Sequence, residues 1–384
     1  MLEARGFIPI AKPLMDEREA EAARRPILTG WVTQGPEVAA FEQEFAEFVS
    51  ARYACAVSNC TTALHLALLA VDVQPGDEVI TVSHSFIATA NSIRYCGGKP
   101  VFVDIDPLTY NMDPDLIESV ITERTSAILC VHQMGMPCDM ERIMAVAQKH
   151  DLPVVEDAAC AAGSEIRWCG KWQRIGKPVG DVVCFSFHPR KVITTGDGGM
   201  LTTDNNEYDK QFRLRRQHGM SVPDTVRHRS SKVIFESYPV LGYNYRMTDI
   251  QAAVGREQLR RLPEIVQVRR ELAAQYLELL VDLPGIQLPA EPAWARSNWQ
   301  SFCVRLPARC GQRDIMQRLL NDGIATRRGI MCAHREESYI AEYGPMSLPR
   351  SEEAQDHCIL LPLYPGMTAH QVGIVAEGLK KAIK

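Results

Sequence analysis

The feature that most constrains the fold is an alternation of short apolar runs with helix-like stretches between residues 53 and 203. The runs have the length of buried strands, and the stretches between them have helical patterning. Parallel strands need crossover connections, and strands covered by helices on both faces are continuously apolar. The sequence therefore predicts an α/β fold with a mostly parallel sheet covered by helices. The expected strands are residues 54–57, 78–82, 100–103, 127–131, 153–156, 182–187 and 200–203, and the expected helices are 61–70, 86–95 and 140–150.

The pattern changes after residue 247, where long charged helices replace the alternation. We expect a smaller C-terminal α+β domain there. The proposed division gives a large domain over residues 13–250 and a small domain over residues 251–384, with the segment 1–12 packing on the small domain. The elements expected after residue 247 include helices at 248–262, 265–280 and 315–321 and a strand at 300–306.

Composition excludes several classes of protein. The chain has 384 residues, of which 46% are apolar, and this is enough for the cores of two domains. A net charge of -5 and the lack of a long basic run argue against a nucleic-acid partner. No apolar stretch reaches the length of a membrane span. The twelve cysteines form no C-x-x-C pair, so we expect no metal site and a reduced cytoplasmic protein.

Lys191 is the first candidate for chemistry. It follows the apolar run 182–187 and precedes the glycine-containing turn 194–199. A lysine at the end of a buried strand is unfavourable unless its amine has a task. One such task is an imine with an aldehyde cofactor such as pyridoxal phosphate (PLP). A solvated loop lysine is the commoner alternative, so the other parts of a PLP site must be present too.

Candidates for those parts lie at other strand ends. Asp157 follows the apolar run 153–156, and its carboxylate can keep a pyridinium nitrogen protonated. Thr61 and Thr62 begin the first expected helix, whose N-terminus favours a phosphate. Ser186 offers a further hydroxyl at the end of its strand. Helix capping is the alternative role for the aspartate and the two threonines.

Phe86 follows the expected strand 78–82 and is a candidate to stack on the cofactor ring. A core position is the alternative for this side chain.

Longer motifs carry a resemblance over nearly the whole chain. They are residues 30–36 (GWVTQGP), 62–68 (TALHLAL), 156–159 (EDAA), 185–191 (FSFHPRK), 194–199 (TTGDGG), 242–247 (GYNYRM) and 361–367 (LPLYPGM). With these motifs the chain resembles the DegT/DnrJ/EryC1/StrS family, which are sugar aminotransferases of the aspartate aminotransferase fold (type I PLP enzymes).

The resemblance implies that Lys191 is the Schiff-base lysine and Asp157 the pyridinium partner, with Ser186, Thr61 and Thr62 on the phosphate. It also implies that Asn244 reaches across a dimer interface to the partner's cofactor phosphate. A homodimer with shared active sites follows. A turn residue is the alternative role for this asparagine.

Two cysteines depart from the family pattern. Cys60 stands where glycine is usual in the phosphate-binding turn, and Cys160 stands where glutamine or histidine usually contacts the cofactor. A thiol is a smaller and weaker donor, which predicts different ring hydrogen bonding or more room for substrate. Family members that act as dehydratases have histidine in place of the lysine, so Lys191 disfavours that activity.

The expected activity is transfer of an amino group, with glutamate as the expected donor, to a keto group of a nucleotide-linked sugar. A keto-cyclitol or another secondary-metabolite ketone is the alternative acceptor, and a non-catalytic PLP-binding regulator is the third possibility. Arg246 is a candidate clamp for the donor carboxylate because its guanidinium is a planar fork. His188 and His334 are candidate sugar or phosphate contacts, with capping or core packing as the alternative.

Overall fold

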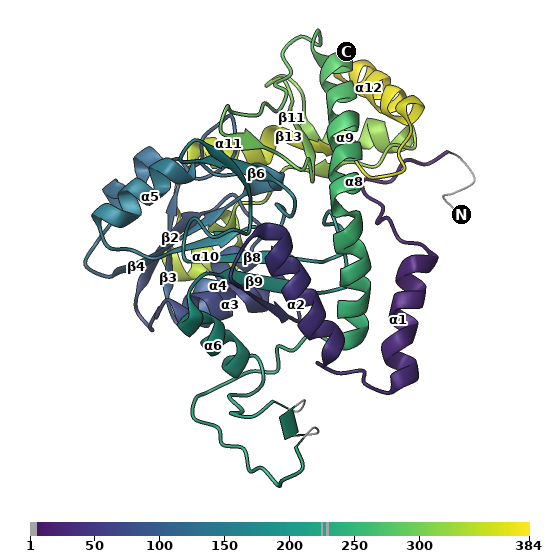
Figure 1. The fold of residues 1–384 in the computed structure, drawn as a ribbon. Coiled ribbons are helices and arrows are strands. Elements are labelled where there is room, and N and C mark those ends of the chain that lie inside the picture. The colour runs from purple at the N-terminus through teal and green to yellow at the C-terminus, as the bar shows by residue number, and fades with distance from the viewer. Residues whose placement is uncertain (1–5, 224–225, 228–229) are drawn as a thin grey trace.

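A seven-stranded sheet forms the centre of the protein (Figure 1). The structure is a computed structural model that describes residues 6–223, 226–227 and 230–384. The strand order is β1-β9-β8-β5-β4-β2-β3, with parallel pairing from β8 through β3 and antiparallel pairing of β9 with β8 and β1. The strands are β1 (Tyr53–Val57), β2 (Glu78–Val82), β3 (Lys99–Val103), β4 (Thr125–Val131), β5 (Val154–Asp157), β8 (Val182–Ser186) and β9 (Gly199–Thr203). The predicted mostly parallel sheet is confirmed.

Apolar cores lie on both faces of this sheet. Successive strand residues alternate between them, so that Val183 and Phe185 belong to one core and Val182 and Cys184 to the other. The first core receives side chains of α2 (Pro36–Val49), α5 (Met140–Lys149) and α8 (Asp249–Leu280). The second receives side chains of α3 (Cys60–Ala70), α4 (Ala88–Tyr95) and α6 (Asn206–Arg215). Another helix, α1 (Glu17–Thr29), packs against α8.

The C-terminal part has its own core and a small antiparallel sheet of order β11-β13-β12, as the α+β prediction required. A further sheet of order β10-β6-β7 pairs β10 of this part with the hairpin β6–β7 at residues 165–174. Ile8 from the N-terminal segment belongs to the C-terminal core and pairs with Ile324. The elements are β6 (Glu165–Trp168), β7 (Lys171–Arg174), β10 (Ala295–Arg296), β11 (Phe302–Arg305), α9 (Gln312–Asn321), β12 (Arg327–Arg328), α10 (Glu337–Tyr343), α11 (Pro349–His357), β13 (Cys358–Leu361) and α12 (Ala369–Ile383).

The two helices expected after residue 247 form one helix, α8, which continues through Pro263. Proline removes one backbone hydrogen bond, but a helix can tolerate it when packing on both sides holds the backbone. Leu262 and Ile265, on either side of the proline, are buried against the first core. Further along, α8 contributes Leu272 and Tyr276 to the C-terminal core, and Figure 1 shows it running alongside both parts. Because α8 serves both cores, the domain boundary at residue 250 stays a prediction.

Within the described residues, no helix combines the length and apolar character that crossing a bilayer requires. The same residues contain no group of three or more His, Cys, Asp or Glu side chains placed to hold a metal ion. All twelve cysteines are free thiols.

Glu42 connects α2 to β1 and to the C-terminal end of α6. Its Oε1 accepts hydrogen bonds from the backbone of Ala56 in β1, at 2.9 Å, and from Arg216. Its Oε2 accepts one from Arg213 of α6 at 2.7 Å. Glu42 and Arg216 are both buried. Burial raises the pKa of Glu42, but the two arginines outweigh it and hold this pKa below its usual value.

Replacing Glu42 with alanine should lower the free energy of unfolding by about 3–5 kcal/mol, because Arg216 would stay buried without its carboxylate. Urea denaturation followed by circular dichroism measures the change. Glu47→Ala, at an exposed position of the same helix, is the matched control and should change stability by less than about 0.5 kcal/mol. Equal effects of the two substitutions would contradict this role for Glu42.

Candidate active site

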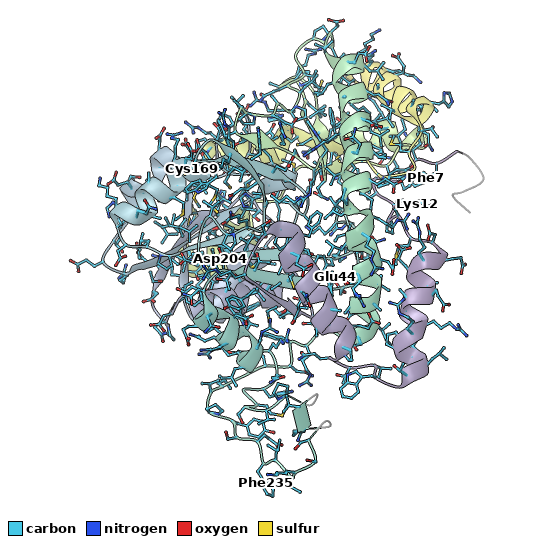
Figure 2. The ribbon with its side chains drawn as sticks, in the orientation of Figure 1. Phe7, Lys12, Glu44, Cys169, Asp204 and Phe235 are labelled. Carbon is cyan, nitrogen blue, oxygen red and sulfur yellow. The ribbon has the colours of Figure 1, made fainter. Side chains whose placement is uncertain are left out.

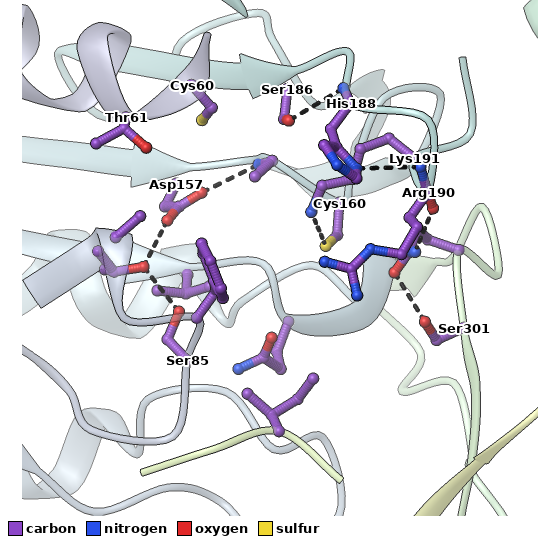
Figure 3. A pocket seen from close by; sticks show the side chains of 18 of the residues that line it. Cys60, Thr61, Ser85, Asp157, Cys160, Ser186, His188, Arg190, Lys191 and Ser301 are labelled. Atoms are coloured by element: carbon purple, nitrogen blue, oxygen red, sulfur yellow. Dashed lines mark hydrogen bonds between the residues drawn. The ribbon is translucent and has the colours of Figure 1, made fainter. Parts of the chain in front are cut away.

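A cavity of about 760 Å³ opens at the carboxyl ends of the parallel strands (Figure 3). Its size is in the usual range for small-molecule sites. Ligands bind at this edge in open parallel sheets. The sheet contributes the last residues of β4, β5 and β8 to the cavity, and the C-terminal part closes it from the other side. Lining residues include Val131, Asp157, Ser186, Gln300, Arg328 and Leu361.

Lys191 lies in the turn that follows β8, and its side chain extends into the cavity. The turn is fixed by hydrogen bonds from the backbone of Lys191 to His188, at 2.8 Å, and from Thr195 to Phe187, at 3.0 Å. The amine donates to the sulfur of Cys160 at 3.1 Å. Burial lowers the pKa of Lys191, but the Cys160 sulfur and the Asp157 carboxylate outweigh it and raise this pKa above its usual value.

Asp157 ends β5 and is buried in the wall of the cavity. Its Oδ2 accepts a hydrogen bond from the Thr89 hydroxyl at 2.8 Å, and its Oδ1 accepts one from the backbone of Ala159 at 3.1 Å. Burial raises the pKa of Asp157, and these hydrogen bonds offset only part of that effect. A cation placed against this carboxylate would favour its ionised form. Glu156 lies outside the cavity lining and instead contacts His132 at 2.9 Å.

The N-terminus of α3 faces the same cavity. Asn59 caps the helix by accepting from the backbone of Thr62 at 2.9 Å, and the Thr62 hydroxyl donates to the Asn59 carbonyl at 2.7 Å. Within the described residues, the backbone N–H groups of Cys60 and Thr61 and the Thr61 hydroxyl have no hydrogen-bond partner. Free N–H groups at a helix start suit a phosphate.

Gly199 of β9 lets this helix start lie close to the sheet. A Cβ atom at position 199 would come within 2.5 Å of the Asn59 carbonyl and 2.8 Å of the Cys60 nitrogen. Any larger residue would push the start of α3 away from the strand.

The sequence matches the DegT/DnrJ/EryC1/StrS aminotransferase family over residues 13–380. The chain belongs to this family. It is 37% identical to the spore coat polysaccharide biosynthesis protein SpsC of Bacillus subtilis, over 98% of this chain and 97% of that protein. These findings confirm the predicted family and the predicted enzyme class.

Solved structures agree with the sequence comparison. Spr1654 of Streptococcus pneumoniae, assigned as a sugar aminotransferase, superposes with a TM-score of 0.91 at 27% identity, over 98% of this chain and 99% of that chain, and was solved in PMP and PLP forms. DesI, solved in the presence of its TDP-sugar product, gives a TM-score of 0.88 at 29% identity, over 99% of this chain and 94% of that chain. The type I PLP fold is thereby confirmed, with PLP as the cofactor of the family.

The residues of this aminotransferase fit PLP. The cavity presents a lysine amine, a buried carboxylate and a helix start with free N–H groups, which match an aldehyde, a pyridine nitrogen and a phosphate. Ser186 and Thr61 both line the cavity, and Figure 3 shows them on its same side.

Eight of the eleven predicted site residues line the cavity. Phe86 is among them, although 64% of its surface is exposed. The eight are Thr61, Thr62, Phe86, Asp157, Cys160, Ser186, His188 and Lys191.

The other three predicted residues lie outside the cavity. Asn244 is exposed, and Arg246 pairs with Val57 through the backbone. His334 is buried, and its ring contacts the Ser83 hydroxyl at 2.6 Å and Glu352 at 3.3 Å. This placement favours the alternative of a packed core histidine.

The sequence analysis missed several polar groups that line the cavity, above all Arg190, Arg327 and Arg328. Arg190 adjoins Lys191, so its position in the chain was a usable signal. Arg327 and Arg328 form the short strand β12, far away in sequence. No spacing rule connects that strand to β8, because only the packing of the C-terminal part brings it to the cavity.

Replacing Asp157 with asparagine should lower the pKa of the Lys191 amine, because the carboxylate that raises it is removed. In cofactor-free protein, the pH dependence of Lys191 acetylation by acetic anhydride, read by mass spectrometry, reports this pKa. Lys149, an exposed lysine on α5, is the internal control and should be acetylated to the same extent in both proteins. An unchanged or higher midpoint for Lys191 would contradict the electrostatic coupling.

Proposed function

We propose that this aminotransferase moves an amino group from an amino acid, with glutamate as the expected donor, to a keto group of a nucleotide-linked sugar. The observation that carries the proposal is that one cavity combines Lys191, Asp157 and the start of α3 with three arginines. Lys191, Asp157 and the start of α3 suit the cofactor, and the arginines suit an acceptor that carries phosphates.

The chain's own groups divide the work as follows. Bound PLP would supply an aldehyde carbon that receives the amino group and a ring that withdraws electrons from the reacting carbon. Lys191 would hold the cofactor covalently and, once free, its Nζ would move the proton from the donor's α-carbon. Asp157 would keep the ring nitrogen protonated, and the start of α3 would hold the phosphate.

The remaining cavity residues shape the site around those groups. Phe86 would cover the ring, and His188 would contact the sugar.

The three arginines support a nucleotide-linked acceptor over a keto-cyclitol. All three are exposed where they line the cavity, and within the described residues no carboxylate forms an ion pair with Arg190 or Arg328. Figure 3 shows the guanidinium of Arg190 extending into the cavity. One guanidinium group can bind two phosphate oxygens at once, so the part of the cavity that these arginines line suits a nucleoside diphosphate. A keto-cyclitol would leave the arginines without an anion.

A homodimer with shared active sites would complete this arrangement. Asn244 is exposed and does not line its own cavity, as expected for a residue that serves a partner subunit. Arg246 lies two positions further and would act on the donor carboxylate in the same partner site.

The segment before Asn244 projects from the body of the protein, with Phe235 at its far end (Figure 2). Val233, Phe235 and Leu241 expose 85%, 91% and 75% of their surfaces. Several large apolar side chains left exposed on one projecting segment favour an interaction surface there. A second copy of the chain is the proposed partner. The proposed compartment is the cytoplasm, where structural disulfides are rare.

Replacing Lys191 with alanine should abolish covalent attachment of PLP and slow the half-reaction with glutamate by at least about 10²–10⁴-fold. Borohydride reduction followed by peptide mass spectrometry tests the attachment, and formation of 2-oxoglutarate tests the half-reaction. Lys149→Ala should leave both unchanged. If borohydride still fixed the cofactor to the Lys191→Ala chain, the proposed role of this lysine would be wrong.

Replacing Arg328 with glutamine should weaken binding of a nucleoside diphosphate about tenfold, since a charge-assisted hydrogen bond is lost. Calorimetry with uridine and thymidine diphosphates measures this, while the rate of the glutamate half-reaction should not change. Arg309→Gln, an exposed arginine outside the cavity, is the matched control. Wild-type protein that binds neither diphosphate would point to an acceptor without a nucleotide.

A further inference from the structure

The contact between Lys191 and Cys160 has chemical consequences beyond amino transfer. The amine and the sulfur are 3.1 Å apart, and both side chains line the cavity (Figure 3). Within the described residues, the thiol is the amine's only hydrogen-bond partner. We propose that Cys160 and Lys191 form an oxidative modification site, at which peroxide converts the contact into a reversible sulfur–nitrogen bond.

Among the twelve cysteines, Cys160 is the one placed for this reaction. Nine of the others are buried, and Cys169 and Cys310 lie outside the cavity. Reactive cysteines are partly exposed and have cationic neighbours. Cys160 is half-buried and faces a lysine amine.

Cys60 is a useful comparison because its thiol lines the same cavity. It is buried, and burial raises the pKa of Cys60 well above its usual value. Its thiol therefore stays protonated and unreactive in the conditions that oxidise Cys160.

The chemistry takes two balanced steps. Hydrogen peroxide oxidises the Cys160 thiol to a sulfenic acid and is itself reduced to water. The raised pKa of Lys191 keeps its amine protonated, so the amine first releases this proton to solvent. The free amine then attacks the sulfur, the S–O bond breaks, and a second water leaves as the S–N bond forms. Sulfenic acids condense in this way with nearby nitrogens as well as with thiols. Two equivalents of a thiol reductant restore the thiol and the amine and become a disulfide.

The geometry favours condensation over further oxidation. The attacking nitrogen is already in contact with the sulfur, so no other nucleophile has to diffuse to the sulfur before the bond forms. The S–N bond would occupy the amine that, under the proposed function, holds the cofactor. The modification would therefore switch the enzyme off reversibly, and bound cofactor would protect the site by occupying the same amine.

The experiment uses the full-length protein, tested both with bound PLP and after its removal. Each sample is treated with hydrogen peroxide, its free thiols are alkylated, and it is digested without reductant. We expect mass spectrometry of the cofactor-free protein to show a linked peptide pair containing Cys160 and Lys191, about 2 Da lighter than the sum of the two peptides. Dithiothreitol should abolish this pair, and bound PLP should reduce its yield several-fold.

The variants separate this site from general oxidation. Cys160→Ser and Lys191→Arg should each abolish the linked pair, whereas Cys60→Ser should leave it unchanged. The inference is overturned if Cys160 is recovered only as sulfinic or sulfonic acid with Lys191 unmodified. A pair about 14 Da heavier than the sum would contain a bridging oxygen and would overturn the direct bond. These readouts need no turnover, so a failure here is distinguishable from a failure of the proposed function.

Discussion

The parallel pairing of β5 with β8 is the constraint on which the site depends. Asp157 lies opposite Cys184 in this pairing, so β5 and β8 end at the same edge of the sheet. The first strand delivers a carboxylate to that edge, and the second leads into the turn that carries Lys191. The register of this pairing fixes the proximity, because a shift by one residue would turn Asp157 to the opposite face.

Asp157 and its neighbour Glu156 have different surroundings, because successive residues of a strand point to opposite faces of the sheet. Asp157 faces the cavity, with Thr89 and the backbone of Ala159 as its hydrogen-bond donors. Glu156 faces the other way, where it contacts His132 and accepts backbone hydrogen bonds from Val179 and Gly180. A buried carboxylate with several donors stabilises the structure, whereas one with few donors remains available to a cation.

The C-terminal part completes the cavity, with residues that include Gln300, Arg328 and Leu361. Its strand β12 brings Arg327 and Arg328 to the wall opposite the sheet, and α8 connects the two cores that hold these walls. The inner groups of the site fit a cofactor that many sugar substrates can share. The outer wall, built from another part of the chain, is where the choice of acceptor can vary.

The sequence by itself determined the strands of the central sheet, its mostly parallel pairing and eight of the residues that line the cavity, because short apolar runs and strand-end positions are local signals. It also identified Lys191 and Asp157, whose strands end at a common edge in any sheet of this kind. Only the tertiary structure decided that α8 continues through Pro263, that His334 packs against Ser83 and Glu352, and that Arg328 reaches the cavity. Packing between segments far apart in the chain determines these outcomes. A local sequence pattern does not predict which distant segment a residue will contact.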